Sequence, residues 1–434
     1  MGRLYYLRSS GPSYPEITIK MDIDNFKEIC VIGWQRSGVS LCDLLLTLNK
    51  KVRVSEEKES SCFDLNKVDN YKASGVKFEF GGHSSNFIKE AQLIVLSPGV
   101  DTINSKAVRI ANELGILSVG EIEFSSWFTQ AKIIAITGTN GKTTTSQLTF
   151  EVLKPSRKRL FLGGNIGTPF SSFVLDTKKR DLIILEVSSF QLETILEFKP
   201  YVAALLNITP DHLDRHPNLQ VYLQAKTNIF KNQDEGDWAV INKNINSREK
   251  IEEMIKAKKV YFSDEFSNEN FSCVYRIASI FGLGKADCLK VFADFKGFSH
   301  RLQFTRELEG VTFINDSKAT NPSSTIWALQ NIKTPIILLA GGKDKGLDYS
   351  SVIPFMKKVK KINLFGEASE KIKKALNSNI ESQVFSSMDE AVLASYKQAA
   401  PGDTVLLSPM CASFDMFSNY EHRGDTFMEI VNSL

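Results

Sequence analysis

The chain has 434 residues, of which 42% are hydrophobic and 24% are charged, and its formal net charge is +3. A chain of this length is too long for one compact core, so about three domains are expected. The small net charge and the lack of a long basic run argue against a dedicated nucleic-acid-binding protein. No apolar run approaches the roughly 20 residues that cross a bilayer, which argues against a membrane partner.

The six cysteines form no CxxC pair and no metal-ligand spacing, and several lie in apolar segments. We therefore expect buried free thiols in a reducing compartment and a cytoplasmic location. Residues 1–25 lack the shape of a signal peptide, because only a short apolar stretch separates Arg3 from Arg8. They are predicted to form an N-terminal extension, with Met21 as an alternative start.

Short apolar runs alternate with helical stretches along the chain, which is typical of α/β domains with mainly parallel sheets. The first domain, residues 26–121, is predicted to be Rossmann-like, because a strand runs into a turn of small residues and then a helix. The turn contains Ser37 and Gly38 but no GxGxxG motif. We interpret it as a phosphate or nucleotide cradle, with a Rossmann-like sheet of unspecified use as an equal alternative. Strands are predicted at 28–33, 51–54, 76–79 and 93–96.

The second domain, residues 122–299, is predicted to be a P-loop ATPase-like, mainly parallel sheet. Its first strand runs into GTNGKT, residues 138–143, and a Thr-rich helix follows. The glycines let backbone N–H groups turn toward phosphate oxygens, Lys142 adds a positive charge, and Thr143 offers a hydroxyl to Mg²⁺. Ile136 breaks the strict Walker pattern, but the strand–loop–helix context favours an ATP site. Strands are predicted at 132–137, 181–186 and 202–207.

Further polar residues follow the later strands of this domain. Glu186 ends an apolar strand, where a buried carboxylate needs a cation or hydrogen-bond donors. Asp211 and His212 begin the stretch DHLDRH, whose side chains are able to bind a metal or act as acid and base. Lys226 lies in a predicted helix, where a lysine by itself is ordinarily a surface residue. Because the GTNGKT loop is expected at the same sheet edge, we favour a Mg²⁺ role for Glu186 and the DHLDRH stretch. The alternatives are helix capping by Ser188 for the first segment and simple loop hydrogen bonds for the second.

The third domain, residues 300–434, is predicted to be dinucleotide-fold-like, although it also lacks GxGxxG. Three of its strands run into the polar loops NDSKATN, GGKDKG and SPMCAS. Three polar loops at one sheet edge suggest a binding face for an anionic group, although each loop alone is compatible with an ordinary cap or turn. Strands are predicted at 312–315, 335–340, 361–365 and 404–407.

Taken together, these segments resemble the Mur ligase family over nearly the whole chain, from Val31 to about Asp425. The matching motifs occur in family order: GTNGKTT, GNIGTP, EVSSFQLE, LNITPDHLDRH, the AK of Lys226, the HR of His300 and Arg301, INDSKATNP, GGKDKG and SPMCASFDMFSNYEHRGD. GTNGKT is shared by all Mur ligases and by folylpolyglutamate synthases. SSFQLE, NDSKATN and the C-terminal motif resemble the branch of the family that adds D-glutamate.

The resemblance implies an ATP-dependent ligase that joins D-glutamate to UDP-N-acetylmuramoyl-L-alanine in peptidoglycan precursor synthesis. The terminal carboxylate of that substrate would attack the γ-phosphate of ATP, and the amine of D-glutamate would then displace phosphate from the acyl phosphate. Phosphoryl transfer of this kind depends mainly on positioning and charge neutralisation. Mg²⁺ at two sites and a monomeric protein are expected.

Residue by residue, the resemblance implies catalytic roles for Lys142, Glu186, His212 and Lys226. Magnesium would be held by Thr143, Glu186, His212 and Lys226, the last after carbamoylation by CO₂, which turns an ammonium into an anionic oxygen ligand. ATP would contact Gly138, Thr139, Asn140, Gly141, Lys142, Thr143, Thr144, Thr145, Asn270, Arg301 and Asp316. The UDP-linked substrate would contact Ser37, Gly38, Asn165 and Ser188. D-glutamate would contact Lys318, Thr320, Lys345, Ser413 and Tyr420, with lysines facing its carboxylates.

The sequence departs from the family pattern in three places. Residues 237–270 form a shorter segment than the family's usual central domain has there, which predicts missing strands. Cys273 replaces the second asparagine of the family's adenine-side motif, in which Asn270 is retained. Residues 34–36 place bulky side chains in the turn that is expected to face the diphosphate.

Other functions are compatible with parts of the sequence. GTNGKT alone also fits a Mur ligase that adds a different amine, or a folylpolyglutamate synthase. A nicotinamide-dependent oxidoreductase would use the first and third domains, but the absence of GxGxxG from both argues against it. A non-catalytic nucleotide-sugar binder is the remaining alternative, and the presence of Lys142, Glu186, His212 and Lys226 argues against it.

Overall fold

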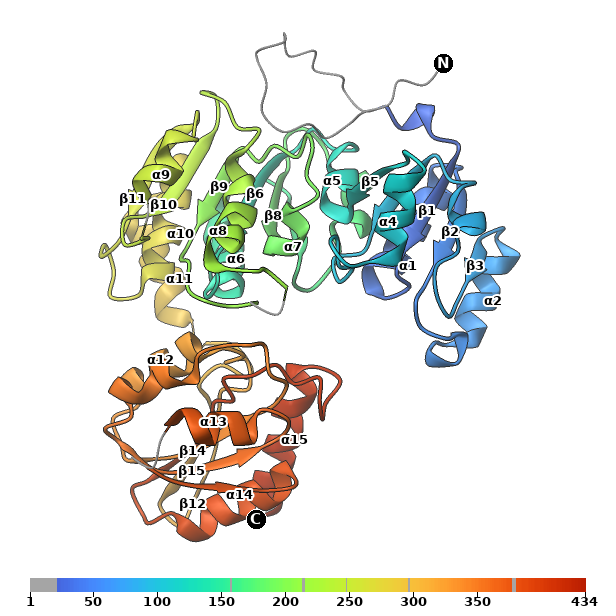
Figure 1. Cartoon of the computed structure of the whole chain (residues 1–434). Coiled ribbons are helices and arrows are strands. Elements are labelled where there is room, and N and C mark those ends of the chain that lie inside the picture. Colours follow the sequence, from blue (N-terminus) through green and yellow to red (C-terminus); the bar gives the residue numbers. More distant parts are fainter. Residues whose placement is uncertain (1–21, 157, 213–214, 247, 296, 377–379) are drawn as a thin grey trace. The chain divides into compact units, whose positions relative to one another are not determined.

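The computed structural model describes residues 22–156, 158–212, 215–246, 248–295, 297–376 and 380–434. Residues 1–21 of the predicted N-terminal extension lie outside this part of the chain. Within the described residues the chain forms three sheets, one of five strands and two of six (Figure 1). The prediction of a three-domain α/β chain is therefore confirmed, whereas the predicted domain boundaries stay predictions.

The first sheet has the strand order β3-β2-β1-β4-β5, and its neighbouring strands run parallel. The strand order reverses between β1 and β4, which is where open α/β sheets bind ligands. Its strands are β1 (Glu28–Ile32), β2 (Lys51–Ser55), β3 (Lys77–Glu79), β4 (Leu93–Leu96) and β5 (Leu117–Gly120). Its helices are α1 (Arg36–Thr47), α2 (Leu65–Ala73), α3 (Ser85–Ile88), α4 (Lys106–Glu113) and α5 (Glu121–Ser126).

The second sheet is also parallel throughout, in the order β11-β10-β9-β6-β8-β7. Helices cover both of its faces, so its central strands are apolar on both sides. Its strands are β6 (Lys132–Thr137), β7 (Leu160–Gly164), β8 (Leu182–Glu186), β9 (Val202–Leu205), β10 (Trp238–Asn242) and β11 (Lys258–Phe262). The helices in this part of the chain are α6 (Lys142–Leu153), α7 (Ser189–Leu192), α8 (Leu219–Thr227), α9 (Arg248–Glu253), α10 (Glu269–Ile280) and α11 (Lys285–Asp294).

The short segment 237–270 keeps its strands. Both β10 and β11 lie in it, and β10 pairs with β9 in the same parallel sheet. The prediction of missing strands is therefore wrong. The short helix α9 connects the two strands, so the sheet keeps both strands although the connection is short.

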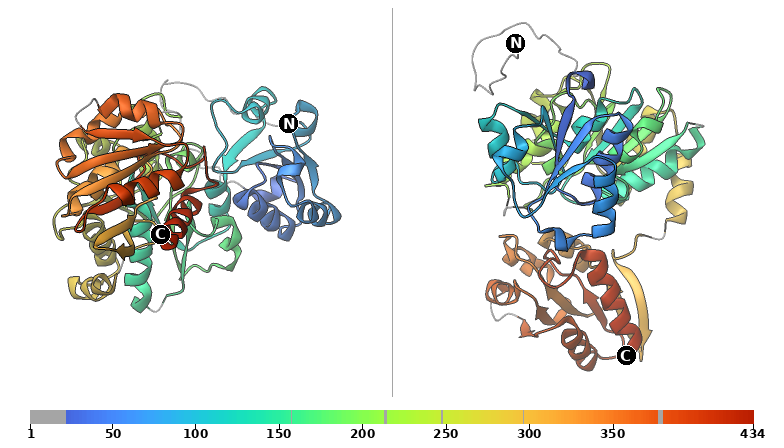
Figure 2. Two further views of the ribbon diagram at one scale, coloured as in Figure 1. Left: turned by 90° about the horizontal axis from the view of Figure 1, so that it is seen from below. Right: turned by 90° about the vertical axis from the view of Figure 1, so that its right-hand side faces the viewer.

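The third sheet has the order β12-β13-β17-β14-β15-β16 and is parallel except for the hairpin of β12 and β13. Helices lie on both faces of this sheet (Figure 2). Alternate residues of β14 pack against different helices: Ile336 and Leu338 share a core with α12 and α13, and Ile337 and Leu339 share one with α14 and α15. Its strands are β12 (Gln303–Leu308), β13 (Val311–Asn315), β14 (Ile336–Gly341), β15 (Val359–Phe365), β16 (Glu381–Val384) and β17 (Thr404–Leu407). Its helices are α12 (Pro322–Asn331), α13 (Ser369–Leu376), α14 (Met388–Gln398) and α15 (Tyr420–Ser433).

Short 3₁₀ helices connect several of these elements. They span Ile23–Asn25, Ser60–Cys62, Lys154–Ser156, Phe170–Ser172, Val174–Asp176, Asn228–Phe230 and Tyr349–Phe355. Among the described residues, no helix combines the length and the apolar character that crossing a membrane requires. All six cysteines are free thiols; five are buried as predicted, and Cys62 is exposed.

The chain divides into two compact units. The first contains the first two sheets, and the second contains the third sheet together with Thr209–Tyr222. This segment follows β9 in the sequence, yet it belongs with the third sheet. In the first unit the two sheets are joined by buried polar contacts: Ser40 bonds to the hydroxyl of Ser171 at 2.8 Å, and Glu121 accepts a bond from the Ser171 backbone at 2.7 Å.

Candidate functional site

The loop between β6 and α6 contains the GTNGKT motif. Gly141 has a φ of +84°, which favours glycine, and a Cβ there would lie 2.1 Å from Oδ1 of Asn270, which would have to move. The backbone N–H groups of Thr139 and Asn140 donate to the carbonyl and the side-chain oxygen of Asn207, at 3.0 and 2.8 Å. Asn207 thus anchors the loop, which leads into the N-terminus of a 12-residue helix, where backbone N–H groups and the helix dipole favour anions.

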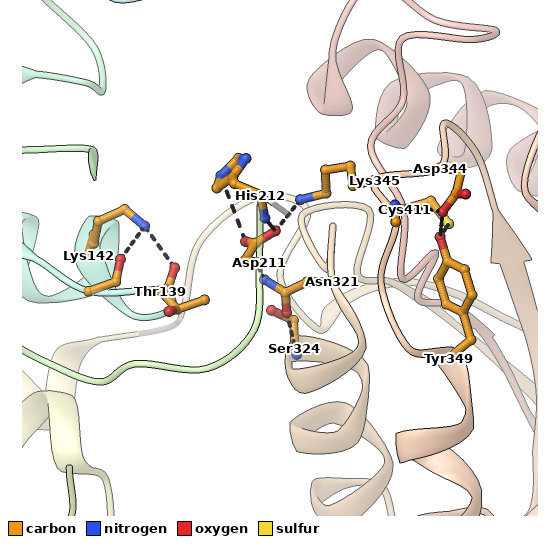
Figure 3. Close-up of polar contacts among 12 residues, drawn as sticks. Thr139, Lys142, Asp211, His212, Asn321, Ser324, Asp344, Lys345, Tyr349 and Cys411 are labelled. Atoms are coloured by element: carbon orange, nitrogen blue, oxygen red, sulfur yellow. Dashed lines mark hydrogen bonds and ion pairs between the residues drawn. The ribbon is translucent and has the colours of Figure 1, made fainter. Parts of the chain in front are cut away.

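Lys142 folds back over this loop. Its Nζ donates to the carbonyls of Gly138 and Thr139, at 2.9 and 2.8 Å (Figure 3). The ammonium therefore lies at the same turn as the N-terminus of α6, where an anion is favoured. The role of Lys142 as a phosphate-binding lysine stays a prediction.

Glu186 contacts two other predicted site residues, Thr143 and Asn165. It lies at the end of β8, is only 3% exposed, and accepts a bond from the Thr143 hydroxyl at 2.8 Å and from the Asn165 amide at 2.8 Å. Adjacent parallel strands end at this edge, which explains why Asn165, after β7, reaches Glu186. A buried carboxylate beside a hydroxyl oxygen offers hard oxygen ligands that suit Mg²⁺. The described residues contain no cluster of three or more His, Cys, Asp or Glu side chains placed to hold a metal.

Lys226 is not a surface residue. It lies in α8, is 1% exposed, and its Nζ donates to the carbonyl of Gly138 at 2.9 Å. The same carbonyl accepts the bond from Lys142, so both lysines reach the phosphate-binding loop. The reading of Lys226 as an ordinary surface lysine is therefore wrong.

Asn270 and Cys273 occupy the two positions of the predicted adenine-side motif, and they lie in different surroundings. Asn270, in α10, accepts a bond from the Thr145 hydroxyl at 3.3 Å and lies beside Gly141. Cys273 is fully buried in the apolar core between α10 and the sheet, and burial raises the pKa of its thiol well above the ordinary value. Cys273 therefore serves packing, and of these two residues only Asn270 places a polar side chain beside the loop.

Ser188 caps a helix, as one sequence reading allowed. Its hydroxyl accepts a bond from the Gln191 backbone at 3.3 Å, and the Gln191 side chain accepts one from the Ser188 backbone at 3.0 Å. This is a capping box, which stabilises the first turn of α7. The Ser188 side chain lies at the same sheet edge as Glu186, so a cap and a substrate contact are compatible.

In the first sheet, the predicted diphosphate turn is less crowded than its sequence suggests. Trp34 is buried and packs edge-on against Tyr71 and Phe78, each ring centroid 4.9 Å away. Its bulk therefore enters the core instead of the turn. Gly38 lies in the first turns of α1, where a Cβ would come within 1.9 Å of the Gly33 carbonyl, so glycine is required for the helix to approach the strand.

In the second unit, the DHLDRH stretch is tied to the third sheet. Asp211 forms an ion pair with Lys345 and accepts a bond from the Asn321 amide at 2.9 Å (Figure 3). Although burial disfavours its charge, Lys345 and His212 hold the pKa of Asp211 well below its usual range. His212 has a φ of +54°, and its Nε2 lies 3.8 Å from Asp211. Residues 213–214 of this stretch lie outside the described residues.

The three polar loops of the third sheet come together. They follow β13, β14 and β17, which are neighbours in the sheet. Lys343 donates from its backbone to the Ala412 carbonyl at 2.9 Å, and Lys318 donates from Nζ to the Tyr420 hydroxyl at 3.1 Å. Ser413 is buried and follows Ala412 directly. Thr320 lies in the Lys318 loop and donates from its backbone to the Lys318 carbonyl at 2.9 Å.

Asp316 is a buried carboxyl at the end of β13. It accepts bonds from the Ser408 hydroxyl at 2.8 Å and the Leu302 backbone at 3.2 Å. Burial raises the pKa of Asp316 to about 7, even though the charge of Arg301 and these two donors oppose the shift. Arg301 and Asp316, both predicted ATP contacts, are therefore close enough to interact.

Asp316→Asn is expected to flatten the pH dependence of stability between about pH 4 and pH 7. The pKa of Asp316 is raised on folding, so the folded protein binds more protons than the unfolded chain in this window and loses stability as pH rises. Asparagine has nearly the same shape as aspartate, but its amide group does not titrate. Urea-unfolding free energies at about pH 5 and about pH 8 measure the difference, with the exposed Asp389→Asn as the control. Equal slopes in the wild type and Asp316→Asn would contradict the expectation.

Comparison with known proteins identifies the family. Family models match residues 27–120 (Mur ligase MurD-like, N-terminal domain), 136–302 (Mur ligase middle domain) and 300–411 (Mur ligase, glutamate ligase domain). The chain belongs to the Mur ligase family. Curated relatives named UDP-N-acetylmuramoylalanine--D-glutamate ligase include those of Thermoanaerobacter sp. (strain X514), 38% identical over 94% of this chain and 98% of the relative, and of Alkaliphilus metalliredigens, 39% identical over 95% and 99%.

Solved structures of MurF and FolC proteins share the fold. MurF from Acinetobacter baumannii matches with a TM-score of 0.62 and 16% identity, over 88% of this chain and 91% of that one. MurF from Thermotoga maritima in complex with ADP matches with a TM-score of 0.59 and 16% identity, over 88% and 95%. E. coli FolC in complex with ADP matches with a TM-score of 0.55 and 16% identity, over 72% and 92%. At 16% identity these likenesses show the fold alone, and they do not select the amine.

Proposed function

We propose that this Mur ligase joins D-glutamate to UDP-N-acetylmuramoyl-L-alanine, using ATP and releasing ADP and phosphate, in peptidoglycan precursor synthesis. The observation that carries the proposal is the near full-length identity of 38% to relatives named UDP-N-acetylmuramoylalanine--D-glutamate ligase. The phosphate-binding loop, with Lys142, Lys226 and Glu186 around it, supports the ATP-dependent part.

The proposed chemistry has two steps. A carboxylate oxygen of the alanine attacks the γ-phosphorus of ATP, so one P–O bond forms and the bond to ADP breaks. The amine nitrogen of D-glutamate then attacks the acyl carbon, loses a proton, and expels phosphate. The protein's part is to align these atoms and to offset the negative charge of the phosphates.

In this proposal the phosphate-binding loop, residues 138–145, holds ATP through its backbone, and Lys142 balances phosphate charge. Mg²⁺, when bound, neutralises negative charge on the phosphate oxygens. Thr143, Glu186, His212 and a carbamoylated Lys226 would be its ligands. The buried position of Glu186 next to Thr143 fits this role, because a carboxylate and a hydroxyl oxygen are hard ligands that Mg²⁺ prefers.

The remaining site residues are assigned by substrate. Ser37 and Gly38 would face the UDP diphosphate, and Asn165 and Ser188 the muramoyl-alanine. Asn270, Arg301 and Asp316 would complete the ATP site. Lys318, Thr320, Lys345, Ser413 and Tyr420 would form the D-glutamate cradle. We further propose a monomeric, cytoplasmic enzyme with domains at residues 26–121, 122–299 and 300–434.

The proposal is tested by ADP release with the purified full-length protein, ATP, Mg²⁺ and UDP-N-acetylmuramoyl-L-alanine. Turnover is expected with D-glutamate and not with L-lysine or diaminopimelate. Turnover with either of those amines but not with D-glutamate would assign a different Mur ligase activity. Turnover that requires a folate would assign the folylpolyglutamate synthase alternative, and tight NAD(H) binding would favour an oxidoreductase.

A further inference from the structure

A buried cation in the second unit has no role in the assignments above. Arg423 lies in the first turns of α15, and its side chain is fully buried. Its four hydrogen bonds within the described residues all go to uncharged oxygens. A buried guanidinium is costly unless its donors are satisfied. The bonds therefore stabilise one arrangement of the backbone around it.

The Arg423 guanidinium joins two loops of the third sheet. In the loop after β13, Nε donates to the Ser317 hydroxyl at 3.0 Å and Nη2 to the Ser317 carbonyl at 2.8 Å. In the loop after β17, Nη1 donates to the Ala412 carbonyl and Nη2 to the Cys411 carbonyl, both at 3.1 Å. Strands β13 and β17 are paired, so Arg423 fastens two neighbouring loops at one sheet edge.

The same network reaches the proposed amine-binding residues. The Ser317 hydroxyl donates to the Tyr420 carbonyl at 2.8 Å, and the Tyr420 hydroxyl accepts a bond from Lys318 at 3.1 Å. Lys318 follows Ser317 in the chain, and Ser413 follows Ala412. Arg423 thus holds the backbone on both sides of the cradle, next to Lys318 and Ser413.

The positive charge of Arg423 also favours an anionic ligand near these loops. Burial lowers the pKa of Arg423 to about 10, which leaves the group fully charged at neutral pH. A cation in a low-dielectric interior attracts an anion that binds nearby more strongly than a cation in water does. D-glutamate carries two carboxylates and one ammonium, so its net negative charge is complementary.

We propose that Arg423 is a positioning residue for the amine substrate, which fixes the distance between the Lys318 loop and the Ser413 loop. The inference rests on the proposed function, because it takes D-glutamate as the ligand of these loops. The planar guanidinium is required because its fork of donors spans two loops at once. A lysine ammonium keeps the charge but is a single point with flexible donors.

Arg423→Lys tests the role in the full-length protein, with initial rates measured as D-glutamate, ATP and UDP-N-acetylmuramoyl-L-alanine are varied in turn. The KM for D-glutamate is expected to rise about tenfold or more, while the KM values for the other two substrates change less than about twofold. Arg306→Lys is the matched control, because Arg306 donates to the Val431 and Asn432 carbonyls near the other end of α15.

Ser317→Ala provides a second, milder variant. It removes the hydroxyl that accepts from Arg423 and donates to the Tyr420 carbonyl. It is expected to raise the same KM by a smaller factor and to lower the melting temperature modestly, because one buried donor loses its partner. Unchanged KM for D-glutamate in both variants, or an equal loss for all three substrates with a lower melting temperature, would overturn the positioning role. Wild-type protein without D-glutamate turnover would instead overturn the proposed function, so the two failures are distinguishable.

Discussion

Lys142→Ala is expected to lower kcat/KM for ATP-dependent ligation about a thousandfold. The ammonium of Lys142 is held at the phosphate-binding loop by the carbonyls of Gly138 and Thr139. Removing one preorganised positive group from a phosphoryl-transfer site costs about 10²–10³ in rate. ADP release under saturating D-glutamate measures the change.

The matched control for this prediction is Lys154→Ala. Lys154 follows the last residue of the same helix, is exposed, and pairs with Glu151 three residues earlier. An exposed pair of this kind contributes little, so activity should stay near wild type. Comparable activity in Lys142→Ala and Lys154→Ala would remove Lys142 from the mechanism.

Lys226→Ala is expected to lower activity about a hundredfold, with partial recovery on addition of a short carboxylic acid such as acetate. In the proposed mechanism the carbamate of Lys226 is an anionic oxygen ligand, whose loss removes roughly 3 kcal/mol of transition-state stabilisation. A small carboxylate can enter the space that the deleted side chain leaves and supply the missing oxygens. Mass spectrometry of the native protein with bicarbonate present should detect the labile CO₂ adduct.

Recovery by acetate separates a chemical role from a structural one. Lys226 is 1% exposed, so its truncation also leaves a cavity that lowers stability. A merely destabilised protein would not regain activity with acetate. Lys231→Ala, which truncates an exposed lysine close by in the chain, is the control. Full activity of Lys226→Ala without any additive would exclude the carbamate.

The central strands follow directly from the sequence. β1, β6, β8 and β14 are continuous apolar runs because they are buried on both faces of parallel sheets. Six strands were not predicted from the sequence: β5, β7, β10, β11, β12 and β16. β12 and β16 are edge strands whose side chains alternate between partly buried and exposed positions, so they lack such a run. The short length of segment 237–270 predicted missing strands, but both β10 and β11 are present because α9 connects them with few residues.

The phosphate-binding loop is likewise predictable from local sequence. A strand, two glycines, a lysine and a helix N-terminus are contiguous, and each acts through its own backbone or its immediate neighbours. The carboxyl ends of parallel strands lie at one edge, so the sequence also predicts that Glu186 lies close to Thr143. Family membership then follows from motifs spread over the whole chain.

Tertiary structure alone decided which distant side chains pair. Asp211 meets Lys345, Lys226 meets the Gly138 carbonyl, and Arg423 meets Ser317, across 134, 88 and 106 residues of chain. No local periodicity encodes these contacts, because they arise from strand order and from burial of charge, which demands a partner. The sequence by itself determined the α/β class, the family and the chemistry of the loop. Folding decided that Lys226 is buried, that Cys273 is a core residue, and that Arg423 joins two loops.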